Sequence, residues 1–458
     1  MIKKIRTELA LLILVYFSIL YSYSFDLFVY ENILYISDGF RNTYLKKFFI
    51  KITNLGDSLW FFLLILIFFF ISYVLKQKKN LAFLYYKNFG IYCLVHLLSV
   101  GITTQIIKFI VGRPRPNHTN LNEGFEFKHF SFNAIFHSFP SGHTSTIVCV
   151  CLIACSVLPS LKLLFYLFGS IIALSRVING AHFFTDILSG GLLAIVIFKI
   201  VNYYFKKNHP NFLSKNFTLN KITLFSKINI IFLCLGLLIT VGFEFDLYFS
   251  FLFYLFSTER VDTIYGETII YIDHLKSSFY LESYDILSIV FIKIFLPFLI
   301  LYIFILPIIS LIVPIRGVFF KYGFNVREII YIYFSGFFSL VLLVNGLFKG
   351  LWGRARPNEV VNFGGDDIFT PWFKISQSCD SNCSFVSGDA SVGFAIIVFY
   401  FITKKNIFIY LSAASGLSLG FIRIIAGGHF LSDIIFAQII VTSSMFICFM
   451  IYKKIMND

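Results

Sequence analysis

The chain has 458 residues, of which 58% are hydrophobic and only 14% carry a charged side chain. This composition excludes a soluble globular domain, because about twelve apolar runs long enough to cross a bilayer recur along the chain. The net charge of +14 does not indicate nucleic-acid binding, since the basic residues lie in short clusters between the apolar runs. Such clusters are typical of the cytoplasmic loops of a polytopic membrane protein.

The first half of the chain predicts six membrane helices. Its basic start and first apolar run resemble a cleavable signal, but Phe25-Asp26-Leu27 recurs as Phe245-Asp246-Leu247 after a later run. The first run is therefore interpreted as one member of a repeat and as a retained helix. The six runs lie near residues 8–29, 57–75, 88–111, 143–158, 161–178 and 184–204.

Two stretches of this half carry groups suited to an anion. Lys108 ends the third run, where an ammonium group is costly without an anionic partner. Arg113 and Arg115 follow on the outward side, against the positive-inside rule, and an anionic ligand would explain both. Pro140-Ser141-Gly142-His143 then opens the fourth run, and the free N–H groups of a helix start bind anions. Its serine adds a hydroxyl, and its histidine can protonate a leaving oxygen.

A third stretch carries a candidate nucleophile. His182 and Asp186 lie four positions apart, so on a helix they share one face and the carboxylate can hold the imidazole. An imidazole held in this way has a fixed tautomer and one free nitrogen, which suits nucleophilic attack. Ser175-Arg176 precedes the pair, and the guanidinium matches phosphate oxygens. Alone, this stretch also fits a polar cluster at a helix end, but the three stretches together predict a phosphate site.

Residues 205–226 are polar and form the one clear linker, which predicts a first unit at 1–204 and a second at 227–458. Six helices in each half make a parallel repeat with both halves in the same orientation. Basic clusters place the linker and both termini in the cytoplasm, and the motif loops on the outer side. The second set of runs lies near 228–255, 285–314, 328–349, 388–403, 407–424 and 431–452.

The second half repeats the motif frame with two changes. Asp389 stands where the first half has His143, and Ile422 replaces Ser175. Asp389 could act as the proton donor only if its surroundings kept it protonated. An active second site and a decayed or substrate-binding one therefore both stay open. The matching positions are Lys349, Arg356, Ser387, Gly388, Arg423, His429 and Asp433.

The cysteines do not form a metal-binding pattern. Cys379 and Cys383 share a polar loop and can form a disulfide if it faces an oxidising compartment, although a reduced pair fits almost equally well. The outward loops at 117–139 and 358–386 are rich in aromatic residues, which indicates interfacial packing or a part in choosing the headgroup. The other six lie in apolar runs as core residues: Cys93, Cys149, Cys151, Cys155, Cys234 and Cys448.

The three motifs resemble those of the type 2 phosphatidic acid phosphatase and vanadium haloperoxidase superfamily, and the resemblance covers the helical core at residues 57–204. It implies a phosphohistidine mechanism that needs no metal or other cofactor, since three cations already neutralise the phosphate. By this resemblance the phosphate is bound by Lys108, Arg115, Ser141, Gly142 and Arg176. The implied catalytic groups are the nucleophile His182, its partner Asp186 and the general acid His143.

We therefore predict an all-α polytopic membrane protein made of two tandem six-helix lipid-phosphatase bundles, with its active sites at the outer face of the cell membrane. The predicted substrate is a phosphomonoester or diphosphate of a membrane lipid. Lipid A phosphate is favoured over undecaprenyl diphosphate, phosphatidylglycerophosphate and phosphatidate. A six-plus-six-helix transporter fits the helix count but not the reactive His–Asp pair. A haloperoxidase shares the motifs, but the known soluble forms lack this hydrophobicity.

Overall fold

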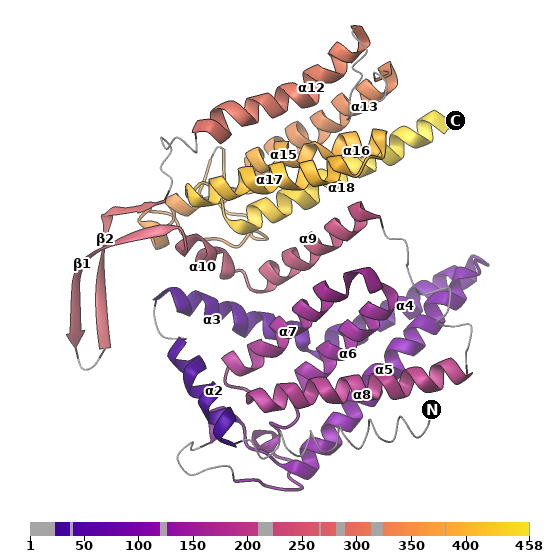
Figure 1. Cartoon of the computed structure of the whole chain (residues 1–458), viewed down its shortest axis with the longest axis vertical. Helices are drawn as coiled ribbons and strands as arrows, with labels where there is room; N and C mark the ends of the chain where they lie inside the picture. Colours follow the sequence, from indigo (N-terminus) through magenta and orange to yellow (C-terminus); the bar gives the residue numbers. More distant parts are fainter. Residues whose placement is uncertain are drawn as a thin grey trace. The chain divides into compact units, whose positions relative to one another are not determined.

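The computed structural model describes residues 23–36, 40–119, 126–208, 223–264, 267–280, 289–312, 324–380 and 382–457. The chain divides into two compact units, Met1–Ile222 and Thr223–Asp458, each of which is described by itself (Figure 1). Both units are helical, which confirms the predicted fold class. Of the proposed linker, residues 209–222 lie outside the described residues.

The first unit consists of helices, most of them joined by short turns, with one long loop between α5 and α6. The predicted run at 8–29 falls mostly outside the described residues, and the structure adds one helix that its mixed composition did not indicate, α3. The elements are α2 (Tyr23–Ile36), α3 (Phe40–Ile52), η1 (Thr53–Gly56), α4 (Ser58–Gln77), α5 (Ala82–Val111), η2 (Pro116–His118), η3 (Ala134–Phe136), α6 (Gly142–Val157), η4 (Pro159–Leu161), α7 (Lys162–Ile178) and α8 (Phe184–Asn208).

Helix α6 lies at the centre of this unit and packs against α5, α7 and α8. The sequence fixes the helix ends: Asp57 caps α4, Ser141 caps α6, and Gly112 ends α5 in the left-handed conformation at φ +60°. Helix α4 instead exposes half of its large apolar side chains, including Leu63, Ile67 and Phe70. In a bilayer such a face contacts lipid.

The second unit has more irregular elements. From its N-terminal end the elements are α9 (Leu224–Val241), α10 (Phe245–Phe251), β1 (Tyr254–Ile264), β2 (Glu267–Phe279), η5 (Ile289–Phe295), α12 (Leu296–Ile312) and α13 (Val326–Gly336). The elements that follow are η6 (Phe337–Phe348), α14 (Lys349–Leu351), η7 (Pro357–Glu359), η8 (Val361–Phe363), α15 (Gly388–Ala395), α16 (Ile397–Thr403), α17 (Ile407–Ile425) and α18 (Leu431–Asn457). Helix α15 packs against α17 and α18, as α6 does against α7 and α8.

Three features of this unit differ from the predicted runs. The run at 228–255 is two helices, because α9 ends at Gly242 and the chain turns before α10. An antiparallel hairpin, β1–β2, follows with Tyr254 opposite Phe279. The run at 328–349 becomes π-helical over η6, whereas the corresponding helix α5 is continuous.

Nine helices within the described residues are long and apolar enough to span a membrane. Two further apolar helices, Gly142–Val157 and Gly388–Thr403, are shorter. The protein is therefore a multi-pass membrane protein, as the sequence predicted.

Candidate active site

The first unit contains a cavity of about 680 Å³ lined by residues of all three motifs. Its polar wall is formed by six of the predicted site residues, Lys108, Arg115, Gly142, His143, Arg176 and His182. Its apolar wall comes from α4 and α5, with Phe62, Leu98 and Ile102 among the lining residues. Leu98 and Ile102 are also exposed on the outer surface of α5, so the cavity reaches the lipid-facing side.

Each of the three cations at this cavity is held by an oxygen of the protein. The Lys108 ammonium donates a hydrogen bond to the His137 carbonyl at 2.8 Å, and Arg115 Nε donates to the Ala134 carbonyl at 3.2 Å. Arg176 Nη1 donates to the Thr53 hydroxyl at 2.9 Å. Arg176 Nε is buried and has no hydrogen-bond partner among the described residues, so a donor is left over for a ligand.

Ser141 and Gly142 lie at the start of α6. The Ser141 hydroxyl oxygen accepts hydrogen bonds from the Thr144 hydroxyl at 3.1 Å and from the Thr144 amide at 3.5 Å. Because both bonds use the oxygen as acceptor, the hydroxyl proton can still be donated to an anion. A Cβ at Gly142 would come 3.8 Å from the Lys108 ammonium nitrogen, which places the helix start beside the cation.

His182 lies in the turn between α7 and α8, and Asp186 lies in the first turn of α8. The spacing predicted that both residues lie on one helix face, but in the structure His182 precedes α8 and only Asp186 lies on it. Asp186 Oδ2 accepts the Phe183 amide at 2.8 Å and faces His182 Nδ1 at 3.7 Å. Burial lowers the pKa of His182 to about 3, so the imidazole is neutral at pH 7.

Arg113 does not face the cavity, which corrects the sequence interpretation. It is fully buried, and its two terminal nitrogens bind the carboxylates of Asp26 and Asp186, each at 2.6 Å. The anions that account for Arg113 on the outward side are therefore two carboxylates of the protein itself. Arg115, two positions later, is the arginine that reaches the cavity.

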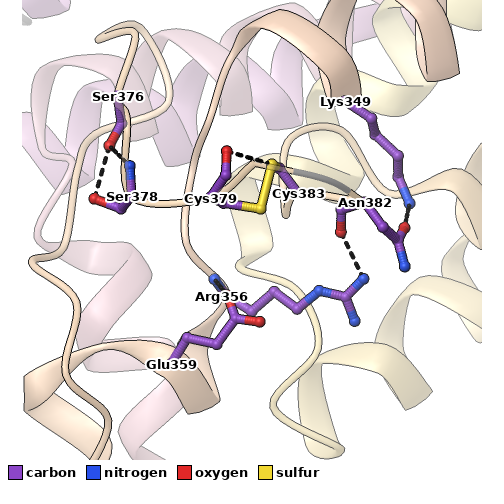
Figure 2. The surroundings of a disulfide bond; sticks show 8 residues. All are labelled: Lys349, Arg356, Glu359, Ser376, Ser378, Cys379, Asn382 and Cys383. Carbon is purple, nitrogen blue, oxygen red and sulfur yellow. Dashed lines mark hydrogen bonds between the residues drawn. A yellow bond between two sulfur atoms is a disulfide. The ribbon is translucent and has the colours of Figure 1, made fainter.

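In the second unit, Lys349 and Arg356 converge on one loop residue (Figure 2). Lys349 Nζ donates to the Asn382 side-chain oxygen at 3.0 Å, and Arg356 Nη2 donates to the Asn382 carbonyl at 2.7 Å. Asn382 lies beside the disulfide that joins Cys379 and Cys383, whose Cα atoms are 5.6 Å apart. The sulfurs are thus bonded, and the loop holds the residue that both cations contact.

Asp389, where the first unit has His143, forms an ion pair with Arg423. The distance from Arg423 Nε to Asp389 Oδ2 is 3.2 Å, and both side chains are partly exposed. A predicted phosphate-binding arginine therefore already has a carboxylate partner. Ser387 caps α15 as Ser141 caps α6, with its hydroxyl accepting the Ala390 amide at 3.4 Å. Gly388 opens α15 beside the Lys349 ammonium group.

His429 and Asp433 repeat the arrangement of the first unit. His429 Nδ1 lies 3.6 Å from Asp433 Oδ2, in the turn before α18. Burial lowers the pKa of His429 to about 4, so this imidazole is also neutral at pH 7. Within the described parts of both units, no three His, Cys, Asp or Glu side chains are grouped to hold a metal ion.

The sequence interpretation missed several buried side chains behind the two His–Asp pairs. In the first unit these are Asp26, Ser138 and Thr185, which bind Arg113 or Asp186. The repeated Phe-Asp-Leu sequence was the signal that marked Asp26 and its counterpart Asp246.

Known proteins are similar to this chain in sequence. The sequence profile of the PAP2 superfamily matches residues 89–210 and 330–457, which is more than half of the chain. The chain is 45% identical over 118 residues to a lipid A 4'-phosphatase of Francisella tularensis subsp. novicida, covering 25% of this chain and 53% of that protein. It is 31% identical over 144 residues to a lipid A 1-phosphatase of Rhizobium etli, covering 30% of this chain and 62% of that protein.

Among solved structures, the chain is similar to a transmembrane PAP2 type phosphatidylglycerolphosphate phosphatase from Bacillus subtilis. The sequence identity is 22% and the TM-score 0.34, over 44% of this chain and 96% of that one. The matches to the two lipid A phosphatases span between half and two thirds of those relatives. The two profile matches show that the chain belongs to the PAP2 superfamily and carries its domain twice.

Proposed function

We propose that the protein is an integral-membrane lipid phosphate phosphatase that works through a phosphohistidine intermediate. The observation that carries this proposal is the cavity of the first unit. In it, three cations and the start of α6 surround a buried neutral imidazole, His182. A phosphate group bound there would meet charge, amide donors and a nucleophile together.

The proposed reaction has two steps with balanced proton transfer. In the first, a nitrogen of His182 attacks phosphorus and the bond from phosphorus to the leaving oxygen breaks, while His143, in its protonated form, gives that oxygen a proton and becomes neutral. In the second, His143 takes a proton from water, the water oxygen attacks phosphorus, and the phosphorus–nitrogen bond breaks to release phosphate. Donors from Ser141 and Gly142 would stabilise the charge on the equatorial oxygens.

The proposed substrate is a phosphomonoester or diphosphate on a membrane lipid, with lipid A phosphate as the first candidate. The apolar wall of the cavity supports a lipid, because Leu98 and Ile102 continue onto the lipid-facing surface of α5. The names of the two lipid A phosphatase relatives support the headgroup. Undecaprenyl diphosphate and phosphatidylglycerophosphate are the alternatives of the same class.

We further propose that both sites face the outer side of the membrane and that both termini are cytoplasmic. The basic clusters between the apolar runs support this orientation. The Cys379–Cys383 disulfide supports it independently, because disulfides persist in oxidising compartments.

The test is phosphate release from a panel of lipid phosphates by the purified protein and three variants, His182→Ala, His429→Ala and the double variant. The double variant should lose roughly 10³-fold or more of the rate, since no nucleophile remains. His129→Ala changes an exposed histidine in the outward loop at 117–139, and this variant should retain activity. Unchanged phosphate release by the double variant would disprove the assignment, and no release from any lipid by the parent would favour a transporter.

A further inference from the structure

We propose that Asp26 and Arg113 are positioning residues for the nucleophile of the first site, and that Asp246 and Arg354 do the same in the second. The inference rests on the proposed function and deepens it. None of these four side chains lines the cavity; they act through the Asp partner of each histidine.

In the first unit, Arg113 bridges two carboxylates in the interior. Nη2 binds Asp26 Oδ2 and Nη1 binds Asp186 Oδ1, each at 2.6 Å, and all three side chains are fully buried. Asp26 is fixed in turn by the Thr185 amide at 2.9 Å and by the Thr185 hydroxyl. The guanidinium carbon lies 4.5 Å from the centre of the Phe183 ring, next to His182 in sequence.

This network decides which oxygen of Asp186 meets the imidazole. Oδ1 is occupied by Arg113, so Oδ2 is the oxygen turned toward His182 Nδ1. Ser138 donates its hydroxyl proton to the same Oδ2 at 2.6 Å and lies 3.5 Å from His182 Nδ1. Asp186 therefore cannot rotate without breaking a buried ion pair, which would leave a buried charge without its partner.

The second unit contains the same network built from a different sequence. Arg354 Nη1 binds Asp433 Oδ1 at 2.6 Å, and Arg354 Nη2 binds Asp246 Oδ2 at 2.9 Å. Ser384 donates to Asp433 Oδ2 at 2.6 Å, as Ser138 does to Asp186. The Arg354 guanidinium carbon lies 4.4 Å from the centre of the Phe430 ring. Two units that differ at the proton donor thus keep the same support for the nucleophile.

The charge of the network suits the intermediate better than the free enzyme. With both carboxylates ionised, the network has one net negative charge in a buried place, and burial opposes that charge by raising the pKa of Asp26. Attack by His182 on phosphorus makes the imidazole ring cationic, next to Asp186. Asp26 therefore raises the negative potential that the network presents when this charge develops, which stabilises the transition state more than the bound substrate.

The experiment uses the full chain with His429→Ala, so that lipid phosphate release comes from the first site alone. Asp26→Asn keeps the shape and removes the charge. We expect kcat to fall by about 10- to 100-fold, the range seen when supporting residues are changed, with KM within threefold of the parent value. Asp26→Glu should restore part of the rate. Glu31→Gln, the same kind of change at an exposed residue of α2, should leave kcat unchanged.

A second measurement does not depend on turnover. Orthovanadate can bond to a nucleophile in place of phosphorus, so its binding to the same protein reports how His182 is held. Asp26→Asn should weaken this binding at least fivefold. Thermal melting in detergent checks that the variant is folded, and Arg113→Lys serves if Asp26→Asn fails to fold.

The inference is wrong if folded Asp26→Asn keeps kcat and vanadate affinity within twofold of the parent. It is also wrong if KM rises while kcat stays constant, because that pattern belongs to lost substrate binding. If the parent releases no phosphate from any lipid, the proposed function fails instead. Vanadate binding then still decides whether Asp26 positions the imidazole.

Discussion

At the scale of single residues, one position separates the two sites. His143 lines the cavity of the first unit, whereas Asp389 at the corresponding place pairs with Arg423. A carboxylate in an ion pair cannot donate a proton to a leaving oxygen, and it competes with phosphate for the arginine. The second site thus differs from the first at the position expected to hold the proton donor, and one of its anion-binding groups already has a carboxylate partner.

We predict that the second site, isolated in a His182→Ala protein, hydrolyses phosphomonoesters slowly at pH 7 and does relatively better on a diphosphate, whose leaving phosphate needs less protonation. Asp389→His should raise the monoester rate by about 10²-fold, at the lower end of general-acid effects. Rates on both substrate types across pH 5 to 8 provide the measurement. Equal and pH-independent rates on the two substrates would contradict the prediction, and a complete lack of turnover would indicate a decayed site.

The sequence predicted which residues meet at the first cavity, because motif order and local spacing are properties of the chain. The family resemblance assigned Arg115, and not Arg113, to the phosphate, but it did not predict the buried carboxylate partner of Arg113. The backbone turn after Gly112 sends Arg113 inward to Asp26 and leaves Arg115 at the cavity. Asp26, one of the two carboxylate partners of Arg113, lies on a helix far away in sequence, so residue spacing alone could not pair them.

At the scale of elements, the end of α5 determines where Arg113 and Arg115 lie. Gly112 has φ +60°, and a Cβ there would lie 1.7 Å from the Lys128 carbonyl oxygen. Gly353 repeats this in the second unit, where a Cβ would lie 1.9 Å from the Ser376 carbonyl oxygen. Only glycine fits this approach of two backbone segments.

Gly112→Ala should therefore displace the loop at Lys128 and disturb Arg113 and Arg115 together. We expect a loss of about 1–3 kcal/mol of stability and at least a tenfold lower first-site rate in the His429→Ala background. Gly191→Ala in α8 is the matched control, since its Cβ would make only an ordinary 3.9 Å contact with Val148. Melting temperature and lipid phosphate release report the two effects, and equal results for both variants would refute the argument.

Apolar runs predicted most of the helices, because the hydrocarbon core sets their length and composition. The same criterion could not indicate the β1–β2 hairpin, because β1 starts at the end of the run at 228–255 and most of the hairpin follows that run. Nor could it show the π-helical segment η6, since hydropathy does not distinguish hydrogen-bond patterns within an apolar helix.

At the scale of the whole molecule, two PAP2 domains follow each other in one chain. The even number of predicted spans in each half would give both domains the same orientation. Single cysteines placed at His129 and at Asp366 should then react with a membrane-impermeant maleimide added from outside, whereas one at Lys207 should not. All three positions are exposed, so accessibility to solvent is matched. Labelling of the Lys207 position from outside would indicate the opposite orientation, with the active sites on the cytosolic side.

The helix that carries the anion-binding turn is short in both units. Helix α6 has 16 residues, which at about 1.5 Å per residue gives a length of about 24 Å, against a hydrocarbon core of about 30 Å. If the far end of this helix meets the opposite interface, the anion-binding start of α6 lies about 6 Å inside the edge of the hydrocarbon core. A substrate must therefore sink, or the bilayer must thin around the protein, before chemistry begins. Bilayer thickness would then act on the rate directly, with thinner membranes giving the faster enzyme.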